Sequence, residues 1–280
     1  MADFLVTNRK TSERQIVSAT PPVDLRDLGF GSGIYDLHRL SPVGESLVRG
    51  NNTIADVVAV MPSSFRLWAA GHGDFQDVAA STPAAVGDPV GYWTEHSGNM
   101  NSATRNGSDT SRPILRQDGG AMYWEFDAVD DRMNTDFAIT GPSLTMGMSY
   151  GYSGRNVIPM IYVSSGTRWA FAATVGSSNE ALTSSGGGTL REVYIDNVQT
   201  PIANRGEAAT ALTGGKSFMM NISDGRNVFE APYFGGPFSN FTMPERVHAV
   251  FVCGEELTDL QRGVWHDFAI AAATTGVSAS

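Results

Sequence analysis

The chain has 280 residues, of which 41% are hydrophobic and 17% charged, and this composition supplies a folded core and excludes a disordered chain. Its formal net charge is −10 and its lysines and arginines do not cluster, which excludes the cationic face that a duplex-binding protein needs. Thirty-one glycines and thirteen prolines favour short strands joined by tight turns over long helices.

Residues 1–62 differ from the rest of the chain, because their apolar residues have only weak periodicity. We therefore predict an irregular N-terminal segment here, which either attaches the chain to other proteins or is an extension packed on the following domain. The first ten residues lack the basic start and apolar stretch of a signal peptide. No run of about 20 uncharged apolar residues is present, so membrane insertion is not expected.

From residue 63 to residue 280, short apolar runs alternate with clusters of glycine, asparagine, aspartate, serine and proline. Around Trp124 and Phe126 the apolar residues recur at every second position, as in a strand with one buried face. This spacing predicts an all-β, two-sheet antiparallel β-sandwich. The expected strands are 123–127, 143–152, 157–163, 168–174, 190–195, 216–222 and 246–252, and the expected exposed loops are 175–189 and 202–215.

One helix is predicted, at the C-terminus. Thr258 and Gln261 have the spacing of a capping box, in which each side chain bonds the main-chain N–H of the other residue. After them an apolar stripe suited to packing on the sandwich recurs every four residues, and residues 274–280 are expected to fray. The stripe consists of Leu260, Val264, Phe268 and Ala272.

An ordered series of short motifs gives the chain a family likeness. The series resembles concanavalin-A-like/laminin-G-like domains of phage structural proteins and bacterial surface proteins, and it covers about residues 65–273. The resemblance implies a jelly-roll sandwich closed by a C-terminal helix. Glu95 and Ala128 depart from the aspartate and glycine that are usual there. The motifs are 67–77 (LWAAGHGDFQD), 82–83 (TP), 87–93 (GDPVGYW), 97–99 (SGN), 103–104 (AT), 112–113 (RP), 124–131 (WEFDAVDD) and 256–259 (ELTD).

The resemblance and the missing signal peptide together predict a non-enzymatic protein on the surface of a phage or phage-like virion. It would be a tail fibre, head fibre, spike or decoration protein that binds host-surface glycans. Residues 1–62 would contact other virion proteins, and a homo-oligomer is expected because several weak sites gain avidity. Three alternatives stay open: a purely structural decoration protein without a ligand, a glycan hydrolase of the same fold, and a cellular lectin.

Four acidic residues carry the strongest chemical hypotheses. Glu125, Asp127 and Asp130 resemble the E-x-D-x-x-E strand of family 16 glucanases, except that the last position is an aspartate. Asp127, Asp130 and Asp131 are candidate calcium ligands, since carboxylates in loops are the oxygen ligands that this ion prefers. The same aspartates could instead only stabilise a turn by bonding its main-chain amides.

Sugar binding would need exposed aromatic side chains to stack on pyranose rings and amides to bond hydroxyl groups. The candidate ligand-binding residues are Trp169, Tyr162, Tyr152, Tyr233 and Asn156. Period-two burial in strands would place the aromatic ones among them in the core instead.

The lone cysteine, Cys253, is predicted to be a buried core thiol, and the five scattered histidines are predicted to be ordinary packing or surface residues.

Overall fold

The computed structural model describes most of the chain after residue 52 and three strands before it. Of residues 160–163, 167–168 and 228–233, and of the three early strands, only the backbone is described. The described ranges are 2–8, 14–19, 35–40, 53–99, 102–105, 110–127, 129–135, 137–152, 154, 156, 160–163, 167–168, 171–174, 189–223, 228–234 and 243–278.

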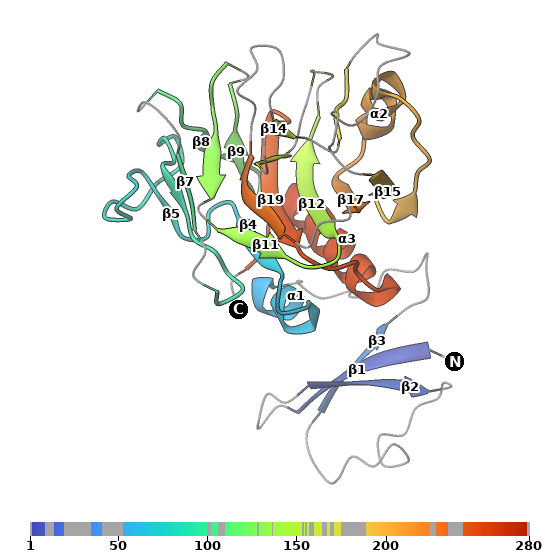
Figure 1. The fold of residues 1–280 in the computed structure, drawn as a ribbon. Coiled ribbons are helices and arrows are strands. Elements are labelled where there is room, and N and C mark those ends of the chain that lie inside the picture. The colour runs from blue at the N-terminus through green and yellow to red at the C-terminus, as the bar shows by residue number, and fades with distance from the viewer. Residues whose placement is uncertain are drawn as a thin grey trace.

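The N-terminal region contains a small antiparallel sheet with the strand order β2-β1-β3 (Figure 1). The prediction of an irregular segment is therefore wrong at these strands. Pairing between strands, which local periodicity does not report, decides whether such short runs become a sheet. The strands are β1 (Ala2–Asn8), β2 (Arg14–Ala19) and β3 (Tyr35–Leu40).

The rest of the chain forms two larger sheets, and every strand pairing described in them is antiparallel. In order, the first sheet consists of β14 (Thr167–Arg168), β13 (Met160–Val163), β18 (Val228–Phe234), β10 (Met133–Thr135), β7 (Ala103–Arg105), β6 (Tyr92–Trp93) and β5 (Asp74–Phe75), with β11 (Ala138–Thr140) also paired to β18. The second consists of β16 (Val198–Gln199), β15 (Thr189–Ile195), β17 (Ser217–Ser223), β12 (Leu144–Gly151), β19 (Arg246–Cys253), β9 (Ala121–Glu125) and β8 (Ile114–Asp118), with β4 (Arg66–Ala69) also paired to β19.

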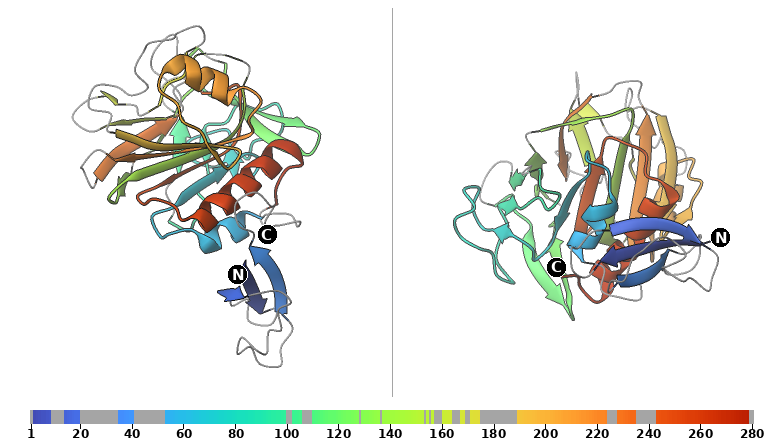
Figure 2. Two further views of the ribbon diagram at one scale, coloured as in Figure 1. Left: turned by 90° about the vertical axis from the view of Figure 1, so that its right-hand side faces the viewer. Right: turned by 90° about the horizontal axis from the view of Figure 1, so that it is seen from below.

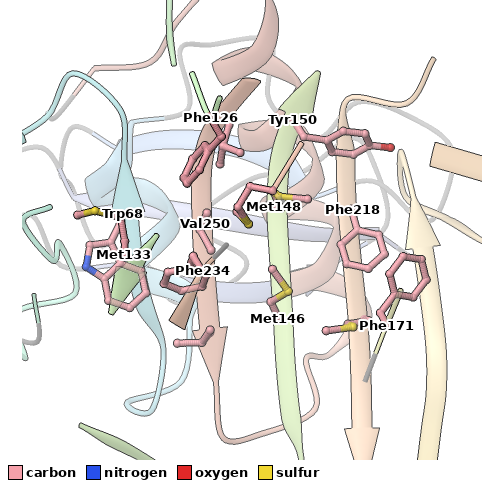
Figure 3. Close-up of a cluster of buried hydrophobic side chains, with 14 of the residues drawn as sticks. Trp68, Phe126, Met133, Met146, Met148, Tyr150, Phe171, Phe218, Phe234 and Val250 are labelled. Atoms are coloured by element: carbon pink, nitrogen blue, oxygen red, sulfur yellow. The ribbon is translucent and has the colours of Figure 1, made fainter. Parts of the chain in front are cut away.

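Side chains of both sheets meet in one hydrophobic core (Figure 3). The first sheet contributes Met133 and Phe234, and the second contributes Trp68, Met146 and Val250, all fully buried. Burial of this much aromatic and aliphatic surface is the main force that holds the sheets together. The prediction of a mostly β chain with two antiparallel sheets is confirmed.

Most of the predicted strands are present, as β9, β12, β15, β17 and β19. The strand expected at 157–163 is β13, which begins only at Met160. The strand expected at 168–174 is largely wrong: β14 ends at Arg168, and Phe171 and Ala173 are instead buried in the core without a continuous strand. Of the expected loop 175–189, residues 175–188 lie outside the described residues.

The loop expected at 202–215 is also wrong, because it contains the helix α2 (Arg205–Leu212). The Asn204 side chain caps this helix by accepting a hydrogen bond from Glu207 N at 2.9 Å. The helix has only eight residues and buries Ala208, Ala209 and Leu212, so it lacks the long apolar stripe that marks a helix in the sequence.

The C-terminal helix α3 (Asp259–Thr274) begins at the predicted capping box. Thr258 N donates to Gln261 Oε1 at 2.9 Å, and Gln261 N donates to Thr258 Oγ1 at 3.3 Å. The helix packs across the outer face of the second sheet, where Trp265 and Phe268 are fully buried (Figure 2).

Helix α1 (Ile54–Val60) packs beside α3, although its residues were assigned to the N-terminal segment by sequence. Gln261 Nε2 donates to Val60 O at 2.9 Å. The C-terminal residues pack here too: Ile54 N donates to Ser278 O at 3.0 Å, and His72 Nε2 bonds Val277 O at 3.0 Å. The prediction that the tail frays is wrong over 275–278, since partners distant in sequence hold it.

Candidate functional site

A half-open pocket of about 460 Å³ lies at the end of β9, beside the start of β19. The register places Glu125 of β9 opposite both Ile114 of β8 and Arg246 of β19. Phe126 N, just past the end of β9, donates to Glu245 O at 3.0 Å. The pocket thus joins three segments that are far apart in the sequence. It is lined by Thr110, Arg112, Ile114, Glu125, Phe126, Asp127, Asp131, Glu245 and Arg246.

The strand period decides which side chains of β9 reach this pocket. Trp124 and Phe126 point into the core, with exposed fractions of 0% and 1%, so Glu125 between them is directed outward. Glu125 Oε2 accepts from Arg116 Nε at 2.8 Å. This half-exposed ion pair contributes little to stability, but it orients the carboxylate at the pocket.

Arg246 is held by two contacts. Its Nη1 donates to Asp118 Oδ2 at 2.8 Å, and its guanidinium lies 4.9 Å from the centre of the Tyr123 ring. The hydrogen bond to Asp118 is the main reason that the pKa of Arg246 is raised. A charged donor is therefore kept in place beside the Glu125 carboxylate.

The three predicted calcium ligands do come together. Carboxylate oxygens of Asp127, Asp130 and Asp131 all lie within 4.8 Å of one another in the turn after β9. Asp127 and Asp130 are exposed, whereas Asp131 is buried. Three oxygens so close together could contribute part of the coordination shell of a calcium ion.

The same aspartates also stabilise the turn. Asp127 N donates to Asp131 Oδ2 at 2.7 Å, and Val129 N donates to Asp127 Oδ1 at 2.7 Å. Ser111 Oγ donates to Asp130 Oδ2 at 2.7 Å. Burial raises the pKa of Asp131 to about 7, and the negative charges of Asp127 and Asp130 add to this effect. Both interpretations of the sequence, ion ligands and turn stabilisation, are compatible with this geometry.

Among the described residues that line this pocket, none is one of the sequence-predicted candidates for sugar binding. Tyr152 is half-buried and packs against the main core, and burial raises its pKa with a further contribution from Glu245. Asn156 is half-buried. Tyr162 lies on β13 and Tyr233 on the neighbouring β18, where Tyr233 is opposite Ile161. Their side chains, and Trp169 as a whole, lie outside the described residues.

Sequence reasoning missed Glu245 and Arg246 as pocket residues. They precede and begin a strand that the sequence predicts, but only its pairing with β9 brings them to the Asp127 turn. No local signal reports which strands are neighbours, so these residues could not be assigned to the site from the sequence.

The predicted core thiol is confirmed, since Cys253 is free and fully buried. His248 and His266 are buried, as packing residues are, whereas His72 and His96 form an edge-to-face ring pair 6.4 Å apart. His38 lies on β3, and its side chain is outside the described residues.

Comparison with protein families, characterised proteins and solved structures gives no match for this chain. In the described part of the chain, no helix is long and apolar enough to cross a membrane.

Proposed function

We propose that this chain is a non-enzymatic surface protein of a phage or phage-like virion and that it binds host-surface glycans through the pocket at the end of β9. It would act as a tail fibre, head fibre, spike or decoration protein. The virion setting, and a jelly-roll order of the strands, rest on the resemblance of the motif series to laminin-G-like domains. The ligand rests on the chemistry of the pocket.

The observation that carries the proposal is the mixed lining of this pocket. Carboxylates such as Glu125 accept hydrogen bonds, and guanidinium groups such as Arg246 donate them. Sugar hydroxyl groups both donate and accept, so they can bond both kinds of group. Ile114, which is partly exposed, adds apolar surface for the C–H groups of a sugar ring.

The pocket is also organised before a ligand arrives. Arg116 holds Glu125 and Asp118 holds Arg246, each at 2.8 Å. A site whose polar side chains are already ordered loses less conformational entropy on binding. This favours recognition of a polar ligand, although these pairs are half-exposed and screened by salt.

A glycan array of host-derived polysaccharides tests the proposal, with the purified full-length chain measured in calcium and in chelator. Binding of particular glycans supports it, and loss of that binding in chelator assigns an ion to Asp127, Asp130 and Asp131. Silence across the array, with the chain still assembling on particles through residues 1–62, would replace it with a purely structural decoration role.

A glycan hydrolase is the second candidate, because Glu125 and Asp127 both line the pocket. Its signature is release of reducing ends from a polysaccharide that the chain binds. Hydrolysis that disappears in Glu125→Gln, with binding retained, would establish it; binding without release of reducing ends supports the non-enzymatic proposal.

A further inference from the structure

Asp74 is a carboxyl group buried at the junction of the two sheets. It begins β5 in the first sheet and lies opposite Trp93 of β6, and only 5% of it is exposed. Trp93 stacks on Trp124 of β9, with ring centres 3.9 Å apart. The carboxyl group therefore lies beside two buried indole rings, one from each sheet.

Only one of the two carboxyl oxygens of Asp74, Oδ2, accepts hydrogen bonds from the described residues. Gly71 N donates to Asp74 Oδ2 at 2.7 Å, and Trp124 Nε1 donates to the same oxygen at 3.1 Å. Asp74 Oδ1 is buried and has no hydrogen-bond partner among the described residues. Asp74 thus ties β9 of the second sheet to β5 of the first, with half of its acceptor capacity unused.

In the part of the chain that the structure describes, no charged side chain compensates a negative charge at Asp74. The titratable groups on the neighbouring elements have contacts of their own, and none of them hydrogen-bonds or ion-pairs with Asp74. Burial without a cation raises the pKa of Asp74 to about 7, against the opposing effect of its two hydrogen bonds. The titratable groups on these neighbouring elements are His72, Asp77, Asp88, Tyr92, Glu95, His96, Tyr123 and Glu125.

We propose that Asp74 is a proton-controlled clamp between the two sheets. With its proton, the neutral carboxyl group stays in the dry junction and holds Trp124. Without it, Oδ2 keeps its two donors but the buried Oδ1 of the carboxylate has none, so water enters between β5 and β9 and the junction loosens. Glu125 follows Trp124 directly, so the clamp lies one residue from the pocket.

The test compares the wild-type chain with Asp74→Asn, which keeps the shape and the acceptor oxygen but carries no charge. Urea unfolding is followed by tryptophan fluorescence from pH 5 to pH 9. The unfolding equilibrium constant of the wild type, divided by that of Asp74→Asn, is expected to rise about a hundred-fold over this range. The histidines and Asp131 are common to both chains, so their titration cancels in the ratio.

Asp77→Asn is the matched control, because Asp77 is partly exposed in the loop after β5 and its pKa is lowered, mainly by a hydrogen bond from Ser81 N. Its ratio to the wild type should stay constant from pH 5 to pH 9. A constant ratio for Asp74→Asn as well would overturn the proposal.

A second readout does not use Asp74→Asn, so it remains decisive if that variant does not fold. The indole N–H resonance of Trp124, assigned by its loss in Trp124→Phe, should shift with a midpoint near pH 7. A Trp124 resonance that does not move between pH 5 and pH 9 would show that Asp74 keeps one protonation state, contrary to the proposal.

Discussion

Gly147, in the middle of β12, allows helix α3 to approach the second sheet. A Cβ atom built there would overlap Phe251 Cε1 and would lie 2.7 Å from both Phe251 Cδ1 and Trp265 Nε1. Phe251 and Trp265 are fully buried and pack edge to face, with ring centres 4.5 Å apart. We therefore expect Gly147→Ala to destabilise the chain by forcing two enclosed rings apart.

The loss of unfolding free energy in Gly147→Ala can be estimated from the two rings that the new methyl group would displace. Adding a methyl group to a packed core typically costs about 1–3 kcal/mol, and rings without free space on either side place this site near the upper value, at about 3 kcal/mol. For a domain of this size, about 3 kcal/mol lowers the Tm by roughly 6–12 °C. Urea unfolding and a thermal scan at one pH measure both quantities.

Gly151, on the same strand, is the control. A Cβ atom there meets only the flexible Arg246 side chain, at 3.3 Å, so Gly151→Ala should change the Tm by little. Equal Tm values for the two variants would refute the argument that Gly147 is required by the contact between α3 and β12.

Two further predictions concern the stability contributed by the helix cap at Thr258 and the pH dependence caused by two buried histidines. Thr258→Ala removes the capping box of α3 and should cost about 1 kcal/mol in urea unfolding, whereas an unchanged midpoint would mean that the cap does not stabilise the helix. Burial lowers the pKa of His248 to about 4 and of His266 to about 3, so the unfolded chain takes up these protons first, near pH 6.5. Both groups therefore remove stability as the pH falls from about 6.5 towards 4, and His248→Gln should flatten the fall in urea midpoint over this range; a slope equal to that of the wild type would contradict the assignment.

The parts of the fold that the sequence predicts are those with a local signal. The capping box at Thr258 and the stripe through Val264 and Phe268 lie within one helix, and both are present in α3. The alternation at Trp124 and Phe126 likewise reports the buried face of β9. In these elements the local pattern and the tertiary packing agree.

The parts that it misses depend on contacts distant in the sequence. Residues 275–278 carry no ordering signal, yet bonds to α1 and His72 hold them. Helix α2 is too short to display a stripe. The Asp127–Asp131 cluster was found because its members are adjacent in the chain, whereas Glu245 and Arg246 reach the same pocket only through the pairing of β19 with β9.

Binding of host-derived glycans by the pocket is the central claim, and the most direct measurement compares the wild-type chain, Arg246→Ala and Arg191→Ala on one glycan array. Arg191 is a matched control, because it is an exposed arginine outside the pocket, 3.7 Å from Glu256. We expect the wild type and Arg191→Ala to bind the same glycans and Arg246→Ala to lose most of that binding. Binding that is equal in all three chains, or absent from the wild type, would contradict the claim.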